Sequence, residues 1–493
     1  MPGRDHKNSL TLDVDACSYT SVGRSSITST PVSLASVERT WNFRINYPPE
    51  EGGRRKPATI GTVIVLLFLV VMITVAVMVA TGGQDKQPPE EGSRRCLCDQ
   101  GCSLSYVETL PGGVTFRQNS SRLPRTSDSW LEVLRSAQRT LDIVSSSWGL
   151  LAGSDPVQND TDVTQGHRLW QELISAGSTR SVRIRILYDD RVASPSELST
   201  LVRRGVATAR GVALDNLLKK QSRVHGNLIV ADEKTFYLGS AAFSWRSLSQ
   251  RKNFGVVVSN CTCLARDVTQ VFSNLWELAA SGTHVQSVAR PMHLCLNQQH
   301  NVTASVTVSP TVLDPGNNSS TLGAVLKVIN SAREYLDISV RDYLPSSRTD
   351  GLSYWPVLQE ALSRATLSRA IQVRLLVSAW KNTPPDMFGY LQSLSNLHGL
   401  GGGHIHVKLF NITGSDGQTP SGPNNSRYVY SEDSIFIGTS DWTKDDFEDN
   451  ISFGLLLNHT ALGFYGNTKY NNIHQQLKAV FERDWNSDSA YPL

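Results

Sequence analysis

The stretch Val133-Leu-Arg-Ser-Ala-Gln-Arg-Thr-Leu-Asp-Ile143 decides the fold, because it recurs 195 residues later as Val328-Ile-Asn-Ser-Ala-Arg-Glu-Tyr-Leu-Asp-Ile338. Both copies have the pattern of an amphipathic helix that ends and runs into a β-strand. A recurrence that keeps the order of its elements is typical of a duplicated unit. The sequence therefore predicts that one α/β unit occurs twice.

Three shorter pairs of segments recur in the same order and at nearly the same spacing. They are Val182–Leu187 with Val373–Val377, Phe236–Ser240 with Ile435–Thr439, and Phe254–Val258 with Phe453–Leu457. We expect homologous halves at 96–290 and 291–493, each an α/β lobe with a mixed sheet flanked by helices, packed about a pseudo-twofold axis. In the first half, a helix is expected to open at Gln165–His167.

The beginning of the chain differs in composition from these halves. Residues 1–57 are rich in Ser, Thr, Pro and charge without an apolar period, which predicts a disordered cytosolic tail. Residues 58–81 are predicted to be a transmembrane signal anchor, because the 21 residues Ile60–Ala80 carry no charge and would cross about 30 Å of hydrocarbon as a helix. A cleaved signal peptide would have a shorter apolar region nearer Met1. Residues 82–95 are expected to form a polar stalk.

Flanking charges and glycosylation motifs give the expected orientation. Arg54, Arg55 and Lys56 precede the apolar segment, which favours a cytosolic amino terminus. All N-x-S/T motifs follow the segment, and this motif is modified only in the secretory lumen. They begin at Asn119, Asn159, Asn260, Asn301, Asn317, Asn318, Asn411, Asn424, Asn450 and Asn458. We therefore predict a single-pass type II glycoprotein of the endoplasmic reticulum, Golgi, lysosome or cell surface with a lumenal carboxyl-terminal region.

The cysteines agree with that compartment. An even number follows the apolar segment, which predicts disulfides, although six cysteines allow 15 pairings and leave the connectivity open. They are Cys96, Cys98, Cys102, Cys261, Cys263 and Cys295. A zinc site is the alternative for the C-x-C-x3-C spacing. The net charge of +3 over 493 residues gives no electrostatic reason to expect nucleic acid or an anionic membrane surface as a partner.

Each half also contains a stretch that ends in an acidic residue and is followed by a Gly-Ser or Gly-Thr-Ser turn. The first half has His225-Gly-Asn-Leu-Ile-Val-Ala-Asp232 followed by Gly239-Ser240, and the second has Asn425-Ser-Arg-Tyr-Val-Tyr-Ser-Glu432 followed by Gly438-Thr-Ser440. These stretches resemble the H-x-K-x4-D signature that the phospholipase D superfamily carries once per half.

The surrounding residues narrow the resemblance. Tyr237–Ala241, Trp245–Leu248, Tyr354–Leu358, and Ile437–Ser440 with Trp442 are similar to the single-pass lysosomal branch of phospholipases D three and four. In character the chain is most similar to the inactive relative of that branch, phospholipase D five.

The resemblance implies a phosphoryl-transfer site shared between the halves. In that family one histidine attacks phosphorus, the other protonates the leaving oxygen, and two lysines hold the phosphate. Here Asn227 and Arg427 stand at the lysine positions, Asn425 at the second histidine and Glu432 at the second aspartate. The predicted relict site comprises His225, Asn227, Asp232, Ser240, Asn425, Arg427, Glu432 and Ser440.

Two further differences from the family pattern also indicate a lost active site. Asp441 is expected to repel a bound phosphate, and a glycan on Asn424 would crowd the former pocket. We therefore predict a catalytically inactive lumenal binding or scaffold protein. The alternative is an active phosphodiesterase, either a 5′-exonuclease or a phospholipase, with a rearranged site based on His225.

No cofactor or metal is expected. His404 and His406 share a face of a Gly-flanked strand and could bind metal, but the spacing gives no third ligand, so a half-exposed strand is favoured. The expected partners are the membrane, through one helix, and N-linked glycans. The resemblance also allows a homodimer. The sequence does not identify a ligand.

Overall fold

The computed structural model describes residues 101–493 except for 113, 115, 117–119, 153–159, 192–195, 283–290, 298–299, 314–319, 350, 352, 414–419 and 460–471. The predicted tail, anchor and stalk over 1–57, 58–81 and 82–95 lie outside the described residues. Among the helices that are described, none is both long and apolar enough to cross a membrane.

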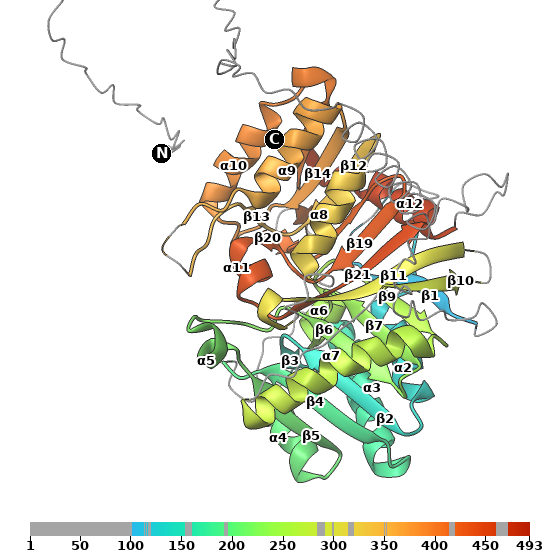
Figure 1. The fold of residues 1–493 in the computed structure, drawn as a ribbon. Coiled ribbons are helices and arrows are strands. Elements are labelled where there is room, and N and C mark those ends of the chain that lie inside the picture. The colour runs from blue at the N-terminus through green and yellow to red at the C-terminus, as the bar shows by residue number, and fades with distance from the viewer. Residues whose placement is uncertain are drawn as a thin grey trace, which may run out of the picture. The chain divides into compact units, whose positions relative to one another are not determined.

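The first half forms a seven-stranded mixed sheet (Figure 1). Strands β2, β4 and β5 are parallel neighbours, and the other pairs are antiparallel. The order across the sheet is β1 (Ser103–Thr109), β9 (Asn253–Ser259), β7 (Thr235–Gly239), β6 (Asn227–Ala231), β2 (Thr140–Ser145), β4 (Arg183–Asp189) and β5 (Ala207–Val212).

The second half repeats this order and adds one strand at each edge. Its strands are β10 (Met292–Leu296), β11 (His300–Ser309), β21 (Ser452–His459), β19 (Ser434–Gly438), β18 (Tyr428–Tyr430), β12 (Tyr335–Val340), β14 (Gln372–Ser378), β15 (His404–Phe410) and β22 (Ala490–Pro492). Counted across the sheet from β11 to β15, its seven inner strands follow the order of the first sheet counted from β1 to β5. Strands β12, β14 and β15 are again parallel, as β2, β4 and β5 are. Two-stranded ladders complete the set: β3 (Trp148–Gly149) with β8 (Phe243–Ser244), β13 (Tyr343–Leu344) with β20 (Trp442–Thr443), and β16 (Ile412–Thr413) with β17 (Pro420–Gly422).

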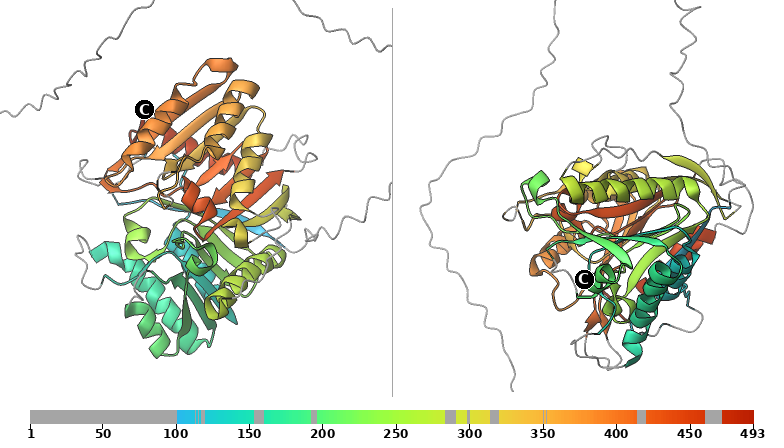
Figure 2. Two further views of the ribbon diagram at one scale, coloured as in Figure 1. Left: turned by 60° about the vertical axis from the view of Figure 1, so that its left-hand side comes forward. Right: turned by 90° about the horizontal axis from the view of Figure 1, so that it is seen from below.

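Helices cover both faces of each sheet, as the burial of the strands requires, and Figure 2 gives two further views of them. In β6, Leu228 and Val230 pack on one face, while Ile229 and Ala231 pack on the other. A strand buried on both faces has a continuous apolar run instead of an alternating one. The first half contains α2 (Thr126–Ser136), α3 (Asp160–Ile174), the π-helix Ser175–Thr179, α4 (Ser196–Arg203), α5 (Asp215–Leu218), α6 (Trp245–Ser249) and α7 (Thr262–Ser281). The second contains α8 (Thr321–Ser331), α9 (Val357–Arg369), α10 (Pro385–Ser395), α11 (Lys444–Glu448), α12 (Asn472–Trp485) and the 3₁₀ turns Thr311–Leu313 and Leu400–Gly402.

The prediction of an α/β fold with mixed sheets flanked by helices is confirmed. Both copies of the opening repeat run from a helix into a strand, α2 into β2 and α8 into β12. The expected start of a helix at Gln165–His167 is wrong, since α3 already begins at Asp160. Its polar first turn, Asp160-Thr-Asp, carries no apolar residue that would mark it as helical.

The two halves share one central hydrophobic core. Phe254 of β9 and Tyr428 of β18 lie with ring centroids 4.9 Å apart, and both belong to the same buried cluster. A buried ion pair reinforces this junction: Arg483 of α12 donates two hydrogen bonds of 2.7 Å to Glu108 of β1. Lys252 Nζ, which is fully buried, lies 2.9 Å from Asp484 Oδ2. Separating the halves would break both pairs and leave their charges without partners, which is costly.

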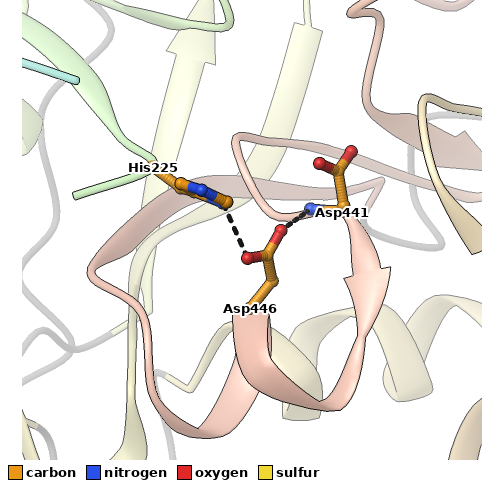
Figure 3. A group of neighbouring side chains, drawn as sticks. All are labelled: His225, Asp441 and Asp446. Atoms are coloured by element: carbon orange, nitrogen blue, oxygen red, sulfur yellow. Dashed lines mark hydrogen bonds and ion pairs between the residues drawn. The ribbon is translucent and has the colours of Figure 1, made fainter. Parts of the chain in front are cut away.

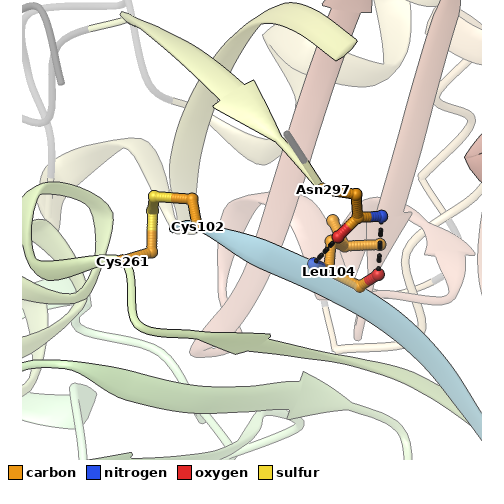
Figure 4. Close-up of a disulfide and its surroundings, with 4 residues drawn as sticks. All are labelled: Cys102, Leu104, Cys261 and Asn297. Atoms are coloured by element: carbon orange, nitrogen blue, oxygen red, sulfur yellow. Dashed lines mark hydrogen bonds between the residues drawn. A yellow bond between two sulfur atoms is a disulfide. The ribbon is translucent and has the colours of Figure 1, made fainter. Parts of the chain in front are cut away.

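A disulfide links Cys102, before β1, to Cys261, before α7 (Figure 4). Beside it, the side chain of Asn297 accepts a hydrogen bond of 2.9 Å from Leu104 N–H and donates one of 3.3 Å to Leu104 C=O. Cys263 is also disulfide-bonded. The two Asn297 hydrogen bonds join β1 of the first half to the segment that follows β10 in the second, whereas the Cys102–Cys261 disulfide lies within the first half. The prediction of disulfides is confirmed for Cys102, Cys261 and Cys263, while Cys96 and Cys98 lie outside the described residues.

Two of the predicted glycosylation sites are buried in the structure. Asn424 has no exposed surface and donates its amide to Ser339 Oγ, and Asn450 is 6% exposed and donates its amide to Asp446. A glycan on either nitrogen would require the side chain to leave its buried position, so the expectation of a glycan on Asn424 stays a prediction that burial disfavours. Asn260 is exposed, and Asn411 and Asn458 are half-buried. The side chains of Asn119, Asn159, Asn301, Asn317 and Asn318 lie outside the described residues.

Candidate functional site

The two motif stretches begin at the junction of the sheets and make crossed contacts. His225 N–H, just before β6, donates to Ile451 C=O (2.8 Å), just before β21. Asn425 N–H donates to Lys252 C=O (2.8 Å), just before β9. Each motif is therefore held by the sheet of the other half, so that His225 and Asn425 occupy corresponding places at one junction.

The His225 imidazole is paired with a buried carboxylate that the sequence did not identify. Its Nδ1 lies 2.6 Å from Oδ1 of Asp446, with 27% of the His225 side chain and 4% of the Asp446 side chain exposed (Figure 3). The second oxygen of Asp446 accepts from Asp441 N–H at 2.7 Å. Burial raises the pKa of Asp446, but His225, Asn450 and Arg341 together hold it well below its usual range. Asp446 therefore fixes the imidazole and leaves its other edge toward solvent.

Helix α11 presents Asp446 at this position. The Thr443 hydroxyl accepts a hydrogen bond from Asp446 N–H at 3.2 Å, which caps the helix. The signal that could have identified the residue is the acidic run Lys444-Asp-Asp-Phe-Glu-Asp449, which begins four residues after Ser440 of the Gly-Thr-Ser turn.

Asp441 does not present an unbalanced charge to the site. Its carboxylate accepts two hydrogen bonds from Arg427, Nε to Oδ1 at 2.7 Å and Nη2 to Oδ2 at 3.0 Å. Arg341 forms a second ion pair with it. Burial would lower the pKa of Arg341, but the carboxylates of Asp441, Asp342 and Asp446 raise it above the usual value. The expectation that Asp441 repels phosphate is therefore wrong, because its charge is balanced by two arginines. Asp441 disfavours phosphate binding in a different way, by holding Arg427 in an ion pair.

Asn227 and Asn425 have structural contacts. The Asn227 carbonyl accepts from Ser146 N–H (3.0 Å) and Ser146 Oγ (3.0 Å), and its amide donates to Gly239 C=O (3.4 Å). The Asn425 amide donates to Asn253 Oδ1 at 3.1 Å. Asn253 also accepts from the Ser240 hydroxyl at 3.2 Å. Both asparagines, at most 5% exposed, act as buried braces between strands.

The remaining motif residues brace turns. Asp232 accepts hydrogen bonds of 2.8 Å from the N–H groups of residues 138, 139 and 140. Burial raises the pKa of Asp232, but these N–H groups outweigh it and lower that pKa. Glu432 accepts from Arg333 N–H at the equivalent turn, and the hydroxyls of Ser440 and Ser452 are hydrogen-bonded to each other. The structure thus brings together His225, Asp441 and Asp446, while Asp232 and Glu432 lie at turns that join helix and strand.

A cavity of about 310 Å³ opens beside His225. Both arginines and carboxylates line it, and most come from loops that carry no family motif. It is lined by Arg191, Gln221, Arg223, His225, Arg341, Asp342, Leu344, Arg348, Thr349, Pro384, Asp441, Thr443, Asp445, Asp446 and Asn450. Among the described residues, the lining includes neither Asn227, Asn425 nor Arg427.

His225, Asp441 and Asp446 also form a group whose ligand atoms lie within 4.8 Å of one another, a spacing suited to a metal ion. The oxygens of Asp441 are already matched by two guanidinium groups, and those of Asp446 by an N–H group, an amide and the imidazole. Carboxylates that are neutralised in this way serve ion pairing, which accounts for the group without a metal.

Three comparisons place the chain among known proteins. Residues 119–415 match a family model described as "PLD3/4, PLD-like domain". The chain is 33% identical over 415 residues to 5'-3' exonuclease PLD3 of Rattus norvegicus, covering 80% of this chain and 82% of that protein. It is 32% identical over 410 residues to 5'-3' exonuclease PLD4 of Mus musculus, covering 80% of each.

A solved structure with the same fold is the crystal structure of phosphatidylserine synthase from Haemophilus influenzae Rd KW20. Its TM-score is 0.50 at 12% identity, and the match covers 79% of this chain and 89% of that one. At this identity the likeness concerns the fold alone.

Proposed function

Because the chain belongs to the phospholipase D-like family described as PLD3/4, PLD-like domain, we propose that it binds phosphate-bearing chain ends in the cavity beside His225 and does not hydrolyse them. In this proposal it is an inactive member, close in character to phospholipase D five. The observation that carries the proposal is the contact between Asn425 and Asn253 at 3.1 Å, at the position where the family's relay needs a second imidazole.

The loss of hydrolysis follows from proton transfer. An imidazole that attacks phosphorus expels an alkoxide, which must take a proton as the P–O bond breaks. The Asn425 amide does not titrate near neutral pH and is committed to Asn253. Removing one member of such a pair costs on the order of thousands-fold in rate. The loss of both lysines adds to this, since Asn227 is uncharged and Arg427 is held by Asp441.

Binding of an anion rests on the arginines of the cavity. Arg191 is paired with Asp215, and Arg341 with Asp342 and Asp441. In contrast, no carboxylate within the described part of the chain forms an ion pair with Arg223 or Arg348, and both are exposed. Guanidinium groups bind phosphate through two parallel hydrogen bonds. We therefore assign the phosphate contact to this pair.

A second candidate function is hydrolysis that starts from His225. It is favoured by the 2.6 Å contact with Asp446, which would orient an attacking imidazole, and by the relatives named 5'-3' exonuclease. This function requires a proton donor other than Asn425. It therefore makes activity dependent on both His225 and Asp446.

The binding experiment uses the full chain in detergent and a single-stranded oligonucleotide labelled at its 3′ end. Fluorescence anisotropy compares a 5′-phosphorylated probe with an unphosphorylated one for the wild type, Arg223→Glu/Arg348→Glu and the exposed control Arg168→Glu. We expect the wild type to bind the phosphorylated probe more tightly than the unphosphorylated one. The affinity for the phosphorylated probe should fall by tenfold or more in the double variant and stay unchanged in Arg168→Glu. Neither probe should be shortened. Equal binding by all three proteins would refute the assignment of these arginines. Shortening that disappears in His225→Ala would favour the second function.

The proposal extends to topology and assembly. We place the site in the secretory or endolysosomal lumen of a type II membrane protein anchored by 58–81, with glycans at exposed positions such as Asn260. The halves 96–290 and 291–493 are related in this proposal by a pseudo-twofold axis, which the matching strand orders and the crossed contacts of His225 and Asn425 support. The proposal also includes a homodimer, which is supported only by the resemblance to the family.

A further inference from the structure

Three histidines gather at one edge of the second half, although the sequence pointed to only two. His404 and His406 lie two residues apart on β15, so their side chains share a face of the strand. His398 belongs to the turn that follows α10. Its ring centroid lies 4.9 Å from that of His404 and 4.5 Å from that of His406, and the His404 and His406 centroids are 6.4 Å apart.

Glycines give the turn the shape that returns His398 to the strand. Gly399, Gly401 and Gly402 have φ values of +78°, +64° and +80°, in the left-handed region where side chains are strained. A Cβ at Gly401 would also lie 2.3 Å from Leu367 C=O of α9. The turn is therefore closely packed against α9 and positions His398 in a defined place.

A hydrogen bond orients the His398 ring and sets its tautomer. His398 Nδ1 lies 3.1 Å from Ile405 C=O. A carbonyl only accepts, so Nδ1 carries the proton and Nε2 is left with a free lone pair. A backbone carbonyl on the far nitrogen is the usual arrangement for a histidine that binds a metal.

We propose that His398, His404 and His406 bind one divalent transition-metal ion of the zinc type, with water as the fourth ligand. With metal–nitrogen distances of about 2.0–2.1 Å, imidazoles around a tetrahedral ion have ring centres about 5 Å apart. Two of the three separations meet this value. The third, 6.4 Å between His404 and His406, is longer, so binding requires the exposed ring of His406 to rotate toward His404. The inference is independent of the proposed function, because none of the three residues lines the cavity beside His225.

Two cationic side chains act on His406, and each is held by a partner within the protein. Arg374 is paired with Asp337 and Glu482, and Lys408 Nζ donates to Trp485 C=O at 2.9 Å. Strand β22 pairs with β15 at Lys408–Phe410, and Leu493 N–H donates to Val407 C=O at 3.2 Å, so the pairing ends before His406 and His404. The ion would tie the glycine turn to the edge of the sheet.

The test is a titration of the full chain in detergent with Zn²⁺ alone, after removal of bound metal with a chelator. Calorimetry compares the wild type with His398→Asn, His406→Asn and the control His293→Asn, an exposed histidine on β10. We expect one equivalent of Zn²⁺ to bind, with a loss of at least about tenfold in affinity when His398 or His406 is replaced. The control should bind as the wild type does.

A second measurement separates binding from a change in folding. Zn²⁺ should raise the melting temperature of the wild type and the His293→Asn control, but not that of His398→Asn, since a ligand stabilises only the state that binds it. Visible absorption of the Co²⁺ form reports tetrahedral coordination. The proposal is overturned if the wild type binds no Zn²⁺, or if His398→Asn binds it as tightly as the wild type, because the ion would then need only the strand pair.

Discussion

Arg427 and Asp441 form a buried two-point ion pair, with Nε 2.7 Å from Oδ1 and Nη2 3.0 Å from Oδ2. Arg427 stands at the second lysine position of the family signature, where a cation would hold phosphate. Asp441 follows the Gly-Thr-Ser turn of the same half. The pair therefore replaces an interaction with substrate by an interaction within the protein.

Replacing Asp441 with Asn should destabilise the chain. The change leaves Arg427 and Arg341 buried without their shared carboxylate, at a cost of about 3–5 kcal/mol. Denaturant unfolding measures this cost. The control is Arg168→Ala, which breaks an exposed pair with Asp128 and should cost about 0–1 kcal/mol. Equal stability of Asp441→Asn and the wild type would contradict the assigned role of the pair.

The contact between His225 and Asp446 predicts a pH dependence of stability. The pKa of Asp446 is lower in the folded chain than the value of about 3.9 in an unfolded one, so the folded state binds fewer protons in this range. Its stabilising contribution is therefore complete above about pH 4 and is lost as the pH falls toward the folded pKa. The melting temperatures of the wild type and Asp446→Asn should converge below about pH 4. A constant difference from acid to neutral pH would argue against this linkage.

Restoring the family motif alone should not restore hydrolysis. Asn227→Lys with Asn425→His supplies an imidazole and an amine, but Arg427 remains bound to Asp441. We expect no turnover of a single-stranded oligonucleotide by this double variant. Adding Asp441→Asn frees Arg427 to hold the phosphate and should bring turnover into the measurable range, because one charged group that stabilises the transition state contributes about a hundredfold or more. Turnover by the double variant itself would mean that the ion pair is not the obstacle.

Burial predicts which glycosylation motifs are used. Asn260→Gln should reduce the apparent mass by one glycan on a gel, because Asn260 is exposed. Asn424→Gln should leave the mass unchanged, because the Asn424 amide is buried against Ser339 Oγ. Treatment with a glycosidase that removes N-linked glycans provides the reference. A mass shift for Asn424→Gln would mean that this segment is modified before it folds.

The repeat predicted the fold because its landmarks are the helix-to-strand and strand-to-strand junctions that build each sheet. The motif positions were also predictable, and Asp232 and Glu432 occupy matching turns. Pairing across the halves was not predictable, since Asp446 is 221 residues from its partner His225. The contacts of Arg427 with Asp441 and of His398 with the strand histidines lie within the second half, but they depend on how a turn returns one side chain to another, which the motifs do not encode. Short motifs such as the Asn424 sequon give no information on burial.

The measurement that tests the central claim most directly is the rate of release of nucleotides from a single-stranded oligonucleotide by the unmodified full chain, at lysosomal and at neutral pH. His225→Ala serves as the matched background, because it removes the one imidazole that remains. If the paired-histidine relay is broken at Asn425, the two proteins should release nucleotides at the same rate, indistinguishable from that of buffer. Release by the unmodified chain that falls by orders of magnitude in His225→Ala would show that the site still works, and the account of an inactive binding protein would have to be abandoned.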